Sequence, residues 1–179
     1  YLSRASAATD TGIPGLMPNV WPISLFERTY GLYVLLLAGL LGYPDLSDVV
    51  QENLDHIDIA LREHNGLNFG ETFAPDVDTT GVGTAVLAAM GREVDPSALT
   101  QFECDGHFET FRGELNASVL SNAHAAHGLK LSGHACSSTE EFLVRRQNFK
   151  GTWEPDKWHV SWGYITLEVL AVLRQHHFF

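Results

Sequence analysis

A chain of 179 residues can bury one substantial core, and 45% hydrophobic residues with a mean hydropathy of −0.04 indicate a soluble globular protein. The net charge of −11 argues against a nucleic-acid-binding surface, which would need clustered Lys and Arg. Two cysteines, Cys104 and Cys136, provide no disulfide framework, and residues 1–12 lack a secretory pattern, so we expect a cytoplasmic protein. Because residue 1 is Tyr and not Met, we also expect a piece of a longer chain.

The first part of the chain is predicted to lead into a long helix. Residues 1–9 resemble the end of a preceding helix. Residues 11–22 are rich in glycine and proline, and we expect them to form an irregular connection between domains. Residues 24–27, Ser-Leu-Phe-Glu, fit a capping box, from which a helix is expected to run to Gly42. The apolar run at residues 32–41 is too short to span a membrane, so we predict a buried core helix and no membrane span.

Three further elements are predicted before residue 101. A helix from about Ser47 to His64, stopped by Gly66, carries an apolar stripe at helical spacing: Val50, Leu54, Ile57 and Leu61. A third helix follows the acidic residues 76–78 and ends at Gly91. Asp95-Pro96 opens a short fourth element, because proline favours the first helical turn.

Three more helices are predicted in the last third of the chain. Asn116 is expected to cap a helix that ends at Gly128, another starts at Ser138, and residues 161–176 form the last, with an apolar set of Leu167, Leu170, Val172 and Leu173. No segment keeps a period of two, so strands are not expected. The predicted fold is all-α, an α/α barrel or toroid of antiparallel helix pairs, with residues 23–179 forming part of one domain after the connection at 1–22.

Asp76 and Asp78, two residues apart at the start of the third helix, form the candidate acid centre. Two carboxylates this close cannot both ionise easily, so one of them is expected to hold a proton near neutral pH. The plainer alternative is that Asp78 or Thr79 only caps the helix.

Four sequence patches and one short motif add a family resemblance. Residues 147–153 read Q-x-x-x-G-x-W, and the patches occur in this order: PNVWPISLFE (18–27), PDVDTT (75–80), HFETFRGELNASVLSNAH (107–124) and WEPDKWHVSWGY (153–164). With them the chain resembles the class II terpene cyclases, the family of copalyl diphosphate synthases, whose D-x-D-D signature supplies an acid inside an α/α barrel. The resemblance covers nearly the whole chain.

The resemblance implies a reaction and roles for five residues. Class II cyclases protonate the terminal alkene of an isoprenyl diphosphate, close rings through carbocations and lose a proton, with the diphosphate retained. Asp78 would be the acid, Asp76 the carboxylate that tunes it, and Asn122 an amide that hydrogen-bonds it. Asn19 would help hold the water that takes the final proton, and Lys157 would lie at the substrate diphosphate. The alternatives are an exposed helix amide for Asn122, a turn residue for Asn19 and a solvated surface charge for Lys157.

The signature departs from D-x-D-D at its fourth acid, which is Thr79. The D-x-D-T-T variant resembles that of some microbial cyclases, including drimenyl diphosphate synthases. Geranylgeranyl diphosphate giving a copalyl-type bicycle is therefore the first expectation, and farnesyl diphosphate giving a drimane the alternative. Thr79 and Lys157 join a substrate-binding set with aromatic residues whose ring faces would stabilise cations in a dry cavity: Trp21, Phe108, Trp158 and Tyr164, with Phe111 and Trp162 as further candidates.

The resemblance also implies Mg²⁺ as cofactor, with ligands outside this chain, and the remaining domains of a parent protein as partners, with a homo-oligomer as a further expectation. A squalene-hopene-type cyclase shares these motifs but takes a hydrocarbon, and the Asp-Lys-Trp segment around Lys157 favours a diphosphate substrate. Two alternatives of other kinds stay open. One is a zinc site made by Cys104 and His107 with His124 and His127, and the other is a non-catalytic helical binding domain.

Overall fold

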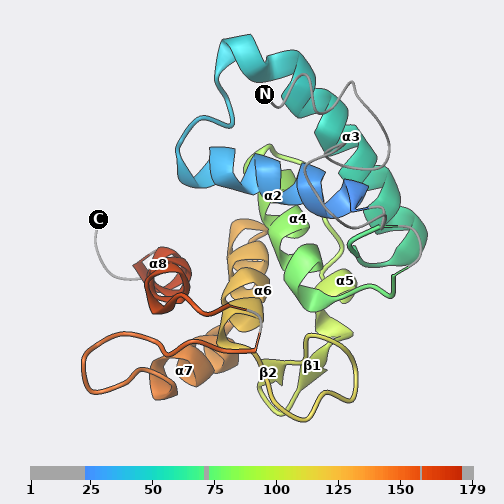
Figure 1. Cartoon of the computed structure of the whole chain (residues 1–179). Coiled ribbons are helices and arrows are strands. Elements are labelled where there is room, and N and C mark those ends of the chain that lie inside the picture. The colour runs from blue at the N-terminus through green and yellow to red at the C-terminus, as the bar shows by residue number, and fades with distance from the viewer. Residues whose placement is uncertain (1–22, 71–72, 158, 175–179) are drawn as a thin grey trace.

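The computed structural model describes residues 23–70, 73–157 and 159–174 (Figure 1). The predictions for residues 1–22, which include Asn19 and Trp21, and the prediction for Trp158 lie outside these residues. The described elements are α2 (Ser24–Leu37), the 3₁₀ turn η1 (Pro44–Leu46), α3 (Ser47–His64), α4 (Val77–Ala89), α5 (Ser97–Thr100), β1 (Glu103–Cys104), β2 (His107–Phe108), α6 (Val119–Leu131), α7 (Ser137–Arg145) and α8 (Trp162–Leu173). The prediction of a helical fold is therefore confirmed.

The helices alternate between an inner row and an outer set. Along the inner row, α2 packs on α4, α4 on α6 and α6 on α8 (Figure 1). Of the helices between them, α3 packs on α2 and α4, α5 on α4, and α7 on α6. Asp78 in α4 contacts His124 in α6, and one turn later along both helices Gly128 lies against Gly81 and Thr84. These two inner helices therefore run in the same direction. Such an alternation of inner and outer helices is what the predicted barrel of helix pairs requires.

Glycines let α4 and α6 approach each other closely. A Cβ on Gly81 would lie 2.6 Å from the carbonyl carbon of His124, and a Cβ on Gly128 would lie 2.8 Å from the carbonyl oxygen of Gly81. Real Cβ atoms do not come so near to backbone, so the crossing depends on two residues without side chains. The two hydrophobic clusters of the described residues flank this crossing, one around α6 and α8 and the other around α2, α3 and α4.

The predicted α3 agrees with the structure in both its ends and its buried stripe. Its stop is Asn65 in the left-handed conformation, with φ of 48°, and not Gly66. For α2 the predicted start agrees with the structure, but the predicted capping box and the predicted end at Gly42 are wrong. Ile23 is the N-cap and Ser24 makes no capping hydrogen bond, while the helix ends at Leu37 because the chain turns at Gly39, where φ is 69°.

Two corrections concern the last third of the chain. Ser118, and not Asn116, caps α6 by accepting a hydrogen bond from the backbone N–H of Ser121, and the helix continues to Leu131. In α8 the predicted apolar set lies partly on the wrong face, since Leu167 and Leu170 are 58% and 40% exposed. The buried face is formed instead by Ile165, Glu168, Val169 and Val172.

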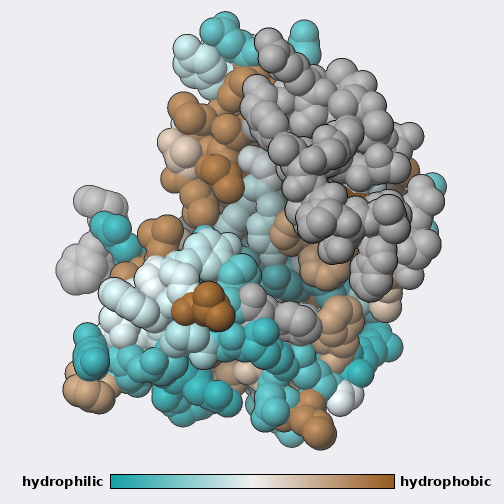
Figure 2. Space-filling model, viewed as in Figure 1, coloured by the Kyte–Doolittle hydropathy of each residue, from teal (hydrophilic) through white to brown (hydrophobic). Residues whose placement is uncertain are grey.

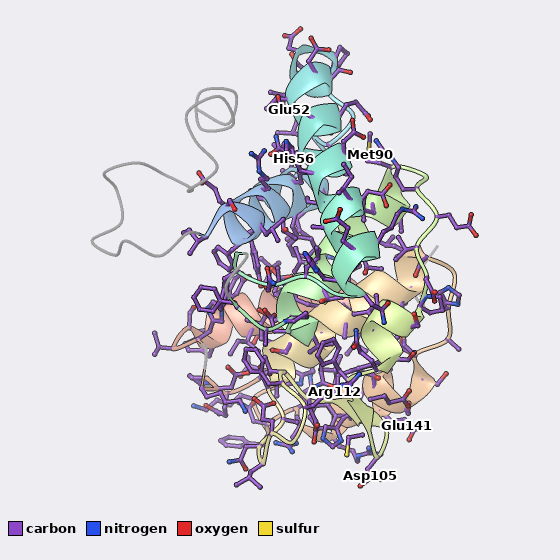
Figure 3. The ribbon with its side chains drawn as sticks, turned by 90° about the vertical axis from the view of Figure 1, so that its right-hand side faces the viewer. Glu52, His56, Met90, Asp105, Arg112 and Glu141 are labelled. Carbon is purple, nitrogen blue, oxygen red and sulfur yellow. The ribbon has the colours of Figure 1, made fainter. Side chains whose placement is uncertain are left out.

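The prediction that strands are absent is also wrong. β1 and β2 form a short antiparallel hairpin in the loop before α6, with Glu103 opposite Phe108 and Cys104 opposite His107. Its turn is Asp105-Gly106, both with positive φ, which is the backbone that an Asp-Gly hairpin turn requires. In Figure 3 the label of Asp105 marks this hairpin at one end of the molecule, and Glu52 and His56 mark α3 at the other.

Exposed apolar residues gather at the end of α2. Figure 2 shows hydrophobic surface there, where Val34, Leu37, Leu40 and Tyr43 are at least 40% exposed, and mostly hydrophilic surface over α7 and the hairpin. Within the described ranges, no helix has both the length and the hydrophobicity needed to cross a bilayer.

Candidate active site

Asp76 is the N-cap of α4. Its Oδ1 accepts a hydrogen bond of 2.7 Å from the backbone N–H of Thr79, and its Oδ2 accepts one of 3.1 Å from the Thr79 hydroxyl. The side chain is buried, and this burial, with the charge of Asp78, raises its pKa to about 7 against the lowering effect of the Thr79 hydrogen bonds. The capping role considered for Asp78 or Thr79 therefore belongs to Asp76.

Asp78, in the first turn of α4, has a hydrogen bond on each carboxylate oxygen. The Tyr30 hydroxyl donates to Oδ2 at 2.5 Å, and Nδ1 of His124 lies 2.8 Å from Oδ1. The side chain is 15% exposed, so the acid is nearly out of water. Burial alone would raise its pKa, but the charge of His124 and hydrogen bonds from His124, Tyr30 and Ser121 together lower the pKa below its usual value.

His124 is fully buried between two carboxylates. Burial lowers the pKa of its imidazole, but the charge and hydrogen bond of Asp78, with a contribution from Glu168, outweigh burial and raise the pKa to about 9. His124 and Asp78 therefore form a buried ion pair at neutral pH. The sequence predicted that one of the two aspartic acids holds a proton near neutral pH, and in this geometry the better proton holder of the two is Asp76.

A second layer of polar side chains lies behind His124. Glu168 Oε2, in α8, is 3.7 Å from His124 Nε2, and it accepts a hydrogen bond of 2.9 Å from the Tyr33 hydroxyl. The same hydroxyl lies 2.8 Å from Nδ1 of His127, whose pKa is lowered to about 4, mainly by burial. A neutral His127 can donate from Nδ1 to the Tyr33 oxygen, which leaves the hydroxyl proton for Glu168.

Asn122 makes no hydrogen bond to Asp78 in the part of the chain that the structure describes. Its amide nitrogen donates to the carbonyls of Phe108 and Ser118, and its Oδ1 accepts from the Phe108 backbone N–H at 2.7 Å. The residue is fully buried, so the alternative of an exposed amide is wrong as well. Asn122 fastens the β2 strand to α6, and the hydrogen bond expected from it to Asp78 comes from His124, two residues further along the helix.

The other predicted substrate-binding residues lie at different distances from this centre. Tyr164 is half-buried, and burial, with smaller contributions from the charges of Glu168 and Asp78, raises its pKa. Thr79 is hydrogen-bonded to Asp76, and Phe108 is buried in the core around α6. Lys157 forms a 2.5 Å ion pair with Glu114 and donates to the carbonyl of Asn116. The additional candidates Phe111 and Trp162 are 36% and 58% exposed.

The residues proposed for zinc lie in two separate places. Cys104 and His107 face each other across the β1–β2 hairpin, while His124 and His127 are engaged with Asp78 and Tyr33 in the core. In the part of the chain that the structure describes, no three His, Cys, Asp or Glu side chains come together as a metal-binding group. These residues do not fit a metal centre, and no catalytic step is assigned to a metal here.

Comparisons with known proteins show which sequences and structures the chain is similar to. No protein-family model matches the chain. It is 38% identical to a (+)-kolavenyl diphosphate synthase from Herpetosiphon aurantiacus over 97% of this chain and 33% of that protein. It is 31% identical to a labda-7,13-dienyl diphosphate synthase from Streptomyces clavuligerus over 98% of this chain and 33% of that protein.

A solved structure shows the same likeness. The ent-copalyl diphosphate synthase from Streptomyces platensis superimposes with a TM-score of 0.74 at 28% identity, over 85% of this chain and 30% of that one. The chain is a homologue of the class II terpene cyclases. It spans about a third of the length of these relatives, and we call it the cyclase segment below.

Sequence reasoning missed three residues of the acid centre of the cyclase segment: Tyr30, His124 and Glu168. His124 was considered only as a zinc ligand, although a histidine in the small-residue run of α6 could have indicated a buried partner for a carboxylate. Glu168 could have been found as the one acidic residue among apolar ones in α8. No local pattern sets Tyr30 apart from the other aromatic residues of α2.

Proposed function

We propose that the protein carrying this cyclase segment is a class II diterpene cyclase that protonates geranylgeranyl diphosphate and releases a bicyclic product with its diphosphate retained. The observation that carries the proposal is the nearly buried Asp78, fixed on both oxygens at the first turn of an inner helix. The relatives, which include kolavenyl and labda-7,13-dienyl diphosphate synthases, support this product class.

The low pKa of Asp78 has a chemical use. An alkene is a very weak base, so its proton donor has to be a strong acid once it is protonated. The imidazolium of His124 stabilises the Asp78 carboxylate that is left after transfer, and this makes the protonated form a strong donor.

The transfer requires Asp78 to take up a proton beforehand. A prenyl chain that covers the exposed part of the Asp78 side chain would remove the remaining water and favour the neutral carboxyl. His124 donates to Oδ1 and Tyr30 to one lone pair of Oδ2, so the second lone pair of Oδ2 is the position that can carry the acid proton. The Oδ2–H bond breaks, the alkene π electrons form the new C–H bond, and the positive charge moves to the neighbouring carbon and through the ring closures.

The base that takes the final proton stays a prediction: it is the water that Asn19 is expected to help hold. Lys157 as a diphosphate ligand would have to leave Glu114 or bind the diphosphate beside it. The same proposal includes Mg²⁺ bound by ligands outside this segment and the other domains of the parent protein as partners. It also includes a homo-oligomer and a cytoplasmic location. The D-x-D-T-T form of the signature keeps farnesyl diphosphate as the second candidate substrate.

The test is a product assay on the full protein with geranylgeranyl or farnesyl diphosphate and Mg²⁺, followed by phosphatase treatment and analysis of the alcohols. We expect a bicyclic C20 alcohol from the wild type and none from Asp78→Asn or Asp78→Ala, each with an unchanged circular dichroism spectrum. If farnesyl diphosphate is the one substrate that is cyclised, and its product is a drimane, then it replaces geranylgeranyl diphosphate as the proposed substrate. No cyclic product from either substrate, or an active Asp78→Asn variant, would overturn the proposal and favour a binding domain.

A further inference from the structure

Glu168 is a buried acidic residue for which the proposed reaction has so far no use. It comes from α8, its side chain is 1% exposed, and its Oε2 is 3.7 Å from Nε2 of His124. That nitrogen is buried and has no hydrogen-bond partner among the described residues. An imidazolium with one N–H on Asp78 and the other unbonded would leave a buried charge only half compensated, and Glu168 is the group that faces the open side.

The surroundings of His124 single out Glu168. Asp78 approaches from α4, the Tyr30 and Tyr33 rings pack edge-on at 5.9 and 5.4 Å between centroids from α2, and Tyr164 and Glu168 come from α8. On its own helix the titratable neighbours are the neutral His127 and, beyond it, Lys130. Apart from Asp78, Glu168 is therefore the one acidic group among these neighbours that is placed to compensate the imidazolium.

We propose that Glu168 is a positioning residue for the proton transfer: its carboxylate keeps His124 charged while Asp78 carries the proton that is to be donated. This inference rests on the proposed function and deepens it. Before transfer, neutral Asp78, the His124 imidazolium and the Glu168 carboxylate sum to zero charge. After transfer they sum to one negative charge opposite the substrate cation, so every stage of the step is electrically compensated inside the protein.

Tyr33 supports this role through geometry. Its hydroxyl donates to the same Glu168 oxygen that faces His124, and it is itself held by His127. Three inner helices, α2, α6 and α8, thus meet in one hydrogen-bonded chain. Removing the Tyr33 hydroxyl would loosen Glu168 but leave its charge in place, whereas Glu168→Gln would remove the charge and keep the shape.

The experiment compares Glu168→Gln with Glu140→Gln in the full protein. Glu140 is also a mostly buried glutamate and forms a 2.5 Å ion pair with Lys130, away from the acid centre. The first readout is the pKa of His124 from NMR of labelled imidazoles, assigned with a His124→Asn variant, and it needs no activity. The second is the pH profile of the cyclisation rate at saturating geranylgeranyl diphosphate.

We expect Glu168→Gln to lower the pKa of His124 by about one unit or more, a tenfold change in its protonation equilibrium. We also expect kcat to fall about fivefold at pH 9, where about half of His124 is protonated in the wild type and about one-tenth in the variant. The alkaline limb should move to lower pH, and KM should change less than about twofold. Glu140→Gln should change neither readout. If Glu168→Gln does not fold, Tyr33→Phe replaces it, with a smaller shift of the His124 pKa in the same direction expected.

An unchanged His124 pKa in the folded Glu168→Gln variant, or in Tyr33→Phe where that variant is used, would overturn the inference. Equal effects of Glu140→Gln, or an unmoved pH profile in an active enzyme, would overturn it too. A wild type without cyclase activity would instead refute the proposed function, and the NMR titration would still report whether Glu168 and His124 are coupled.

Discussion

Two groups of charged residues lie near opposite ends of α4 and show how burial changes what an ion pair does. Near its N-terminus, Asp78 pairs with His124 beside Glu168, and these side chains are 15%, 0% and 1% exposed. Just beyond its C-terminus, Arg92 pairs with Asp55 and Asp58 of α3, and these side chains are 29%, 60% and 17% exposed.

The difference lies in what water can replace. Arg92 and Asp55 are open to water, which can solvate either charge if its partner leaves, so their pair contributes little to stability. At His124 no solvent is available, and a charge without its partner is strongly destabilising. The buried group therefore has shifted pKa values and a geometry fixed by three helices, which are the conditions for acid chemistry, whereas the exposed group only fastens α4 to α3.

The strongest way to break the buried cluster is to separate the helices that carry it. Gly81→Ala would place a Cβ 2.6 Å from backbone of α6, and backbone cannot move aside as a side chain can. We expect a loss of about 3 kcal/mol or more in unfolding free energy, measured by urea denaturation of the full protein. Gly42→Ala is the matched control, since its Cβ would meet nothing within 4 Å, and a similar loss there would contradict the explanation.

The second prediction concerns pH. The pKa of His124 is raised from 6.5 to about 9, so its contribution to stability is complete below pH 6.5 and is lost as the pH rises towards 9. We expect the unfolding free energy of the wild type to fall by about 2 to 3 kcal/mol across this window. His124→Asn should be less stable at pH 6.5 but should show a much flatter slope. Equal slopes in the two proteins would mean that His124 is not charged when folded.

The sequence predicted the helical fold well and the acid centre only in part, for identifiable reasons. Both ends of α3 were predicted correctly because its apolar stripe and its polar face alternate at helical spacing. The end of α2 was missed because the apolar run at residues 32–41 continues past Leu37, so it gives no sign of the turn at Gly39. Asp76 and Asp78 were found by their spacing. Their partners come from α2, α6 and α8, and which side chains meet across helices depends on the packing angle and on the glycine crossing, which no local pattern encodes.

Asn122 gives a third test, because the family resemblance and the structure assign it different roles. The resemblance implies a hydrogen bond to Asp78, whereas the structure shows hydrogen bonds to the Phe108 backbone. Its amide satisfies both backbone groups of Phe108, so Asn122→Ala would leave a buried N–H and C=O without a partner. We expect about 2 kcal/mol lower stability and an unchanged cyclisation rate per folded molecule. A slower rate at unchanged stability would restore the predicted contact with the acid.

The smallest effect is expected at the exposed cluster. Arg92→Ala removes hydrogen bonds to Asp55, Asp58 and Gln51, but these side chains remain in contact with water. We expect at most about 1 kcal/mol lower stability, a difference from the wild type that shrinks at high salt, and no change in the pH profile of cyclisation. A loss as large as that of His124→Asn would show that burial is not what separates the two groups, because the Arg92 cluster would then be as sensitive as one that water cannot reach.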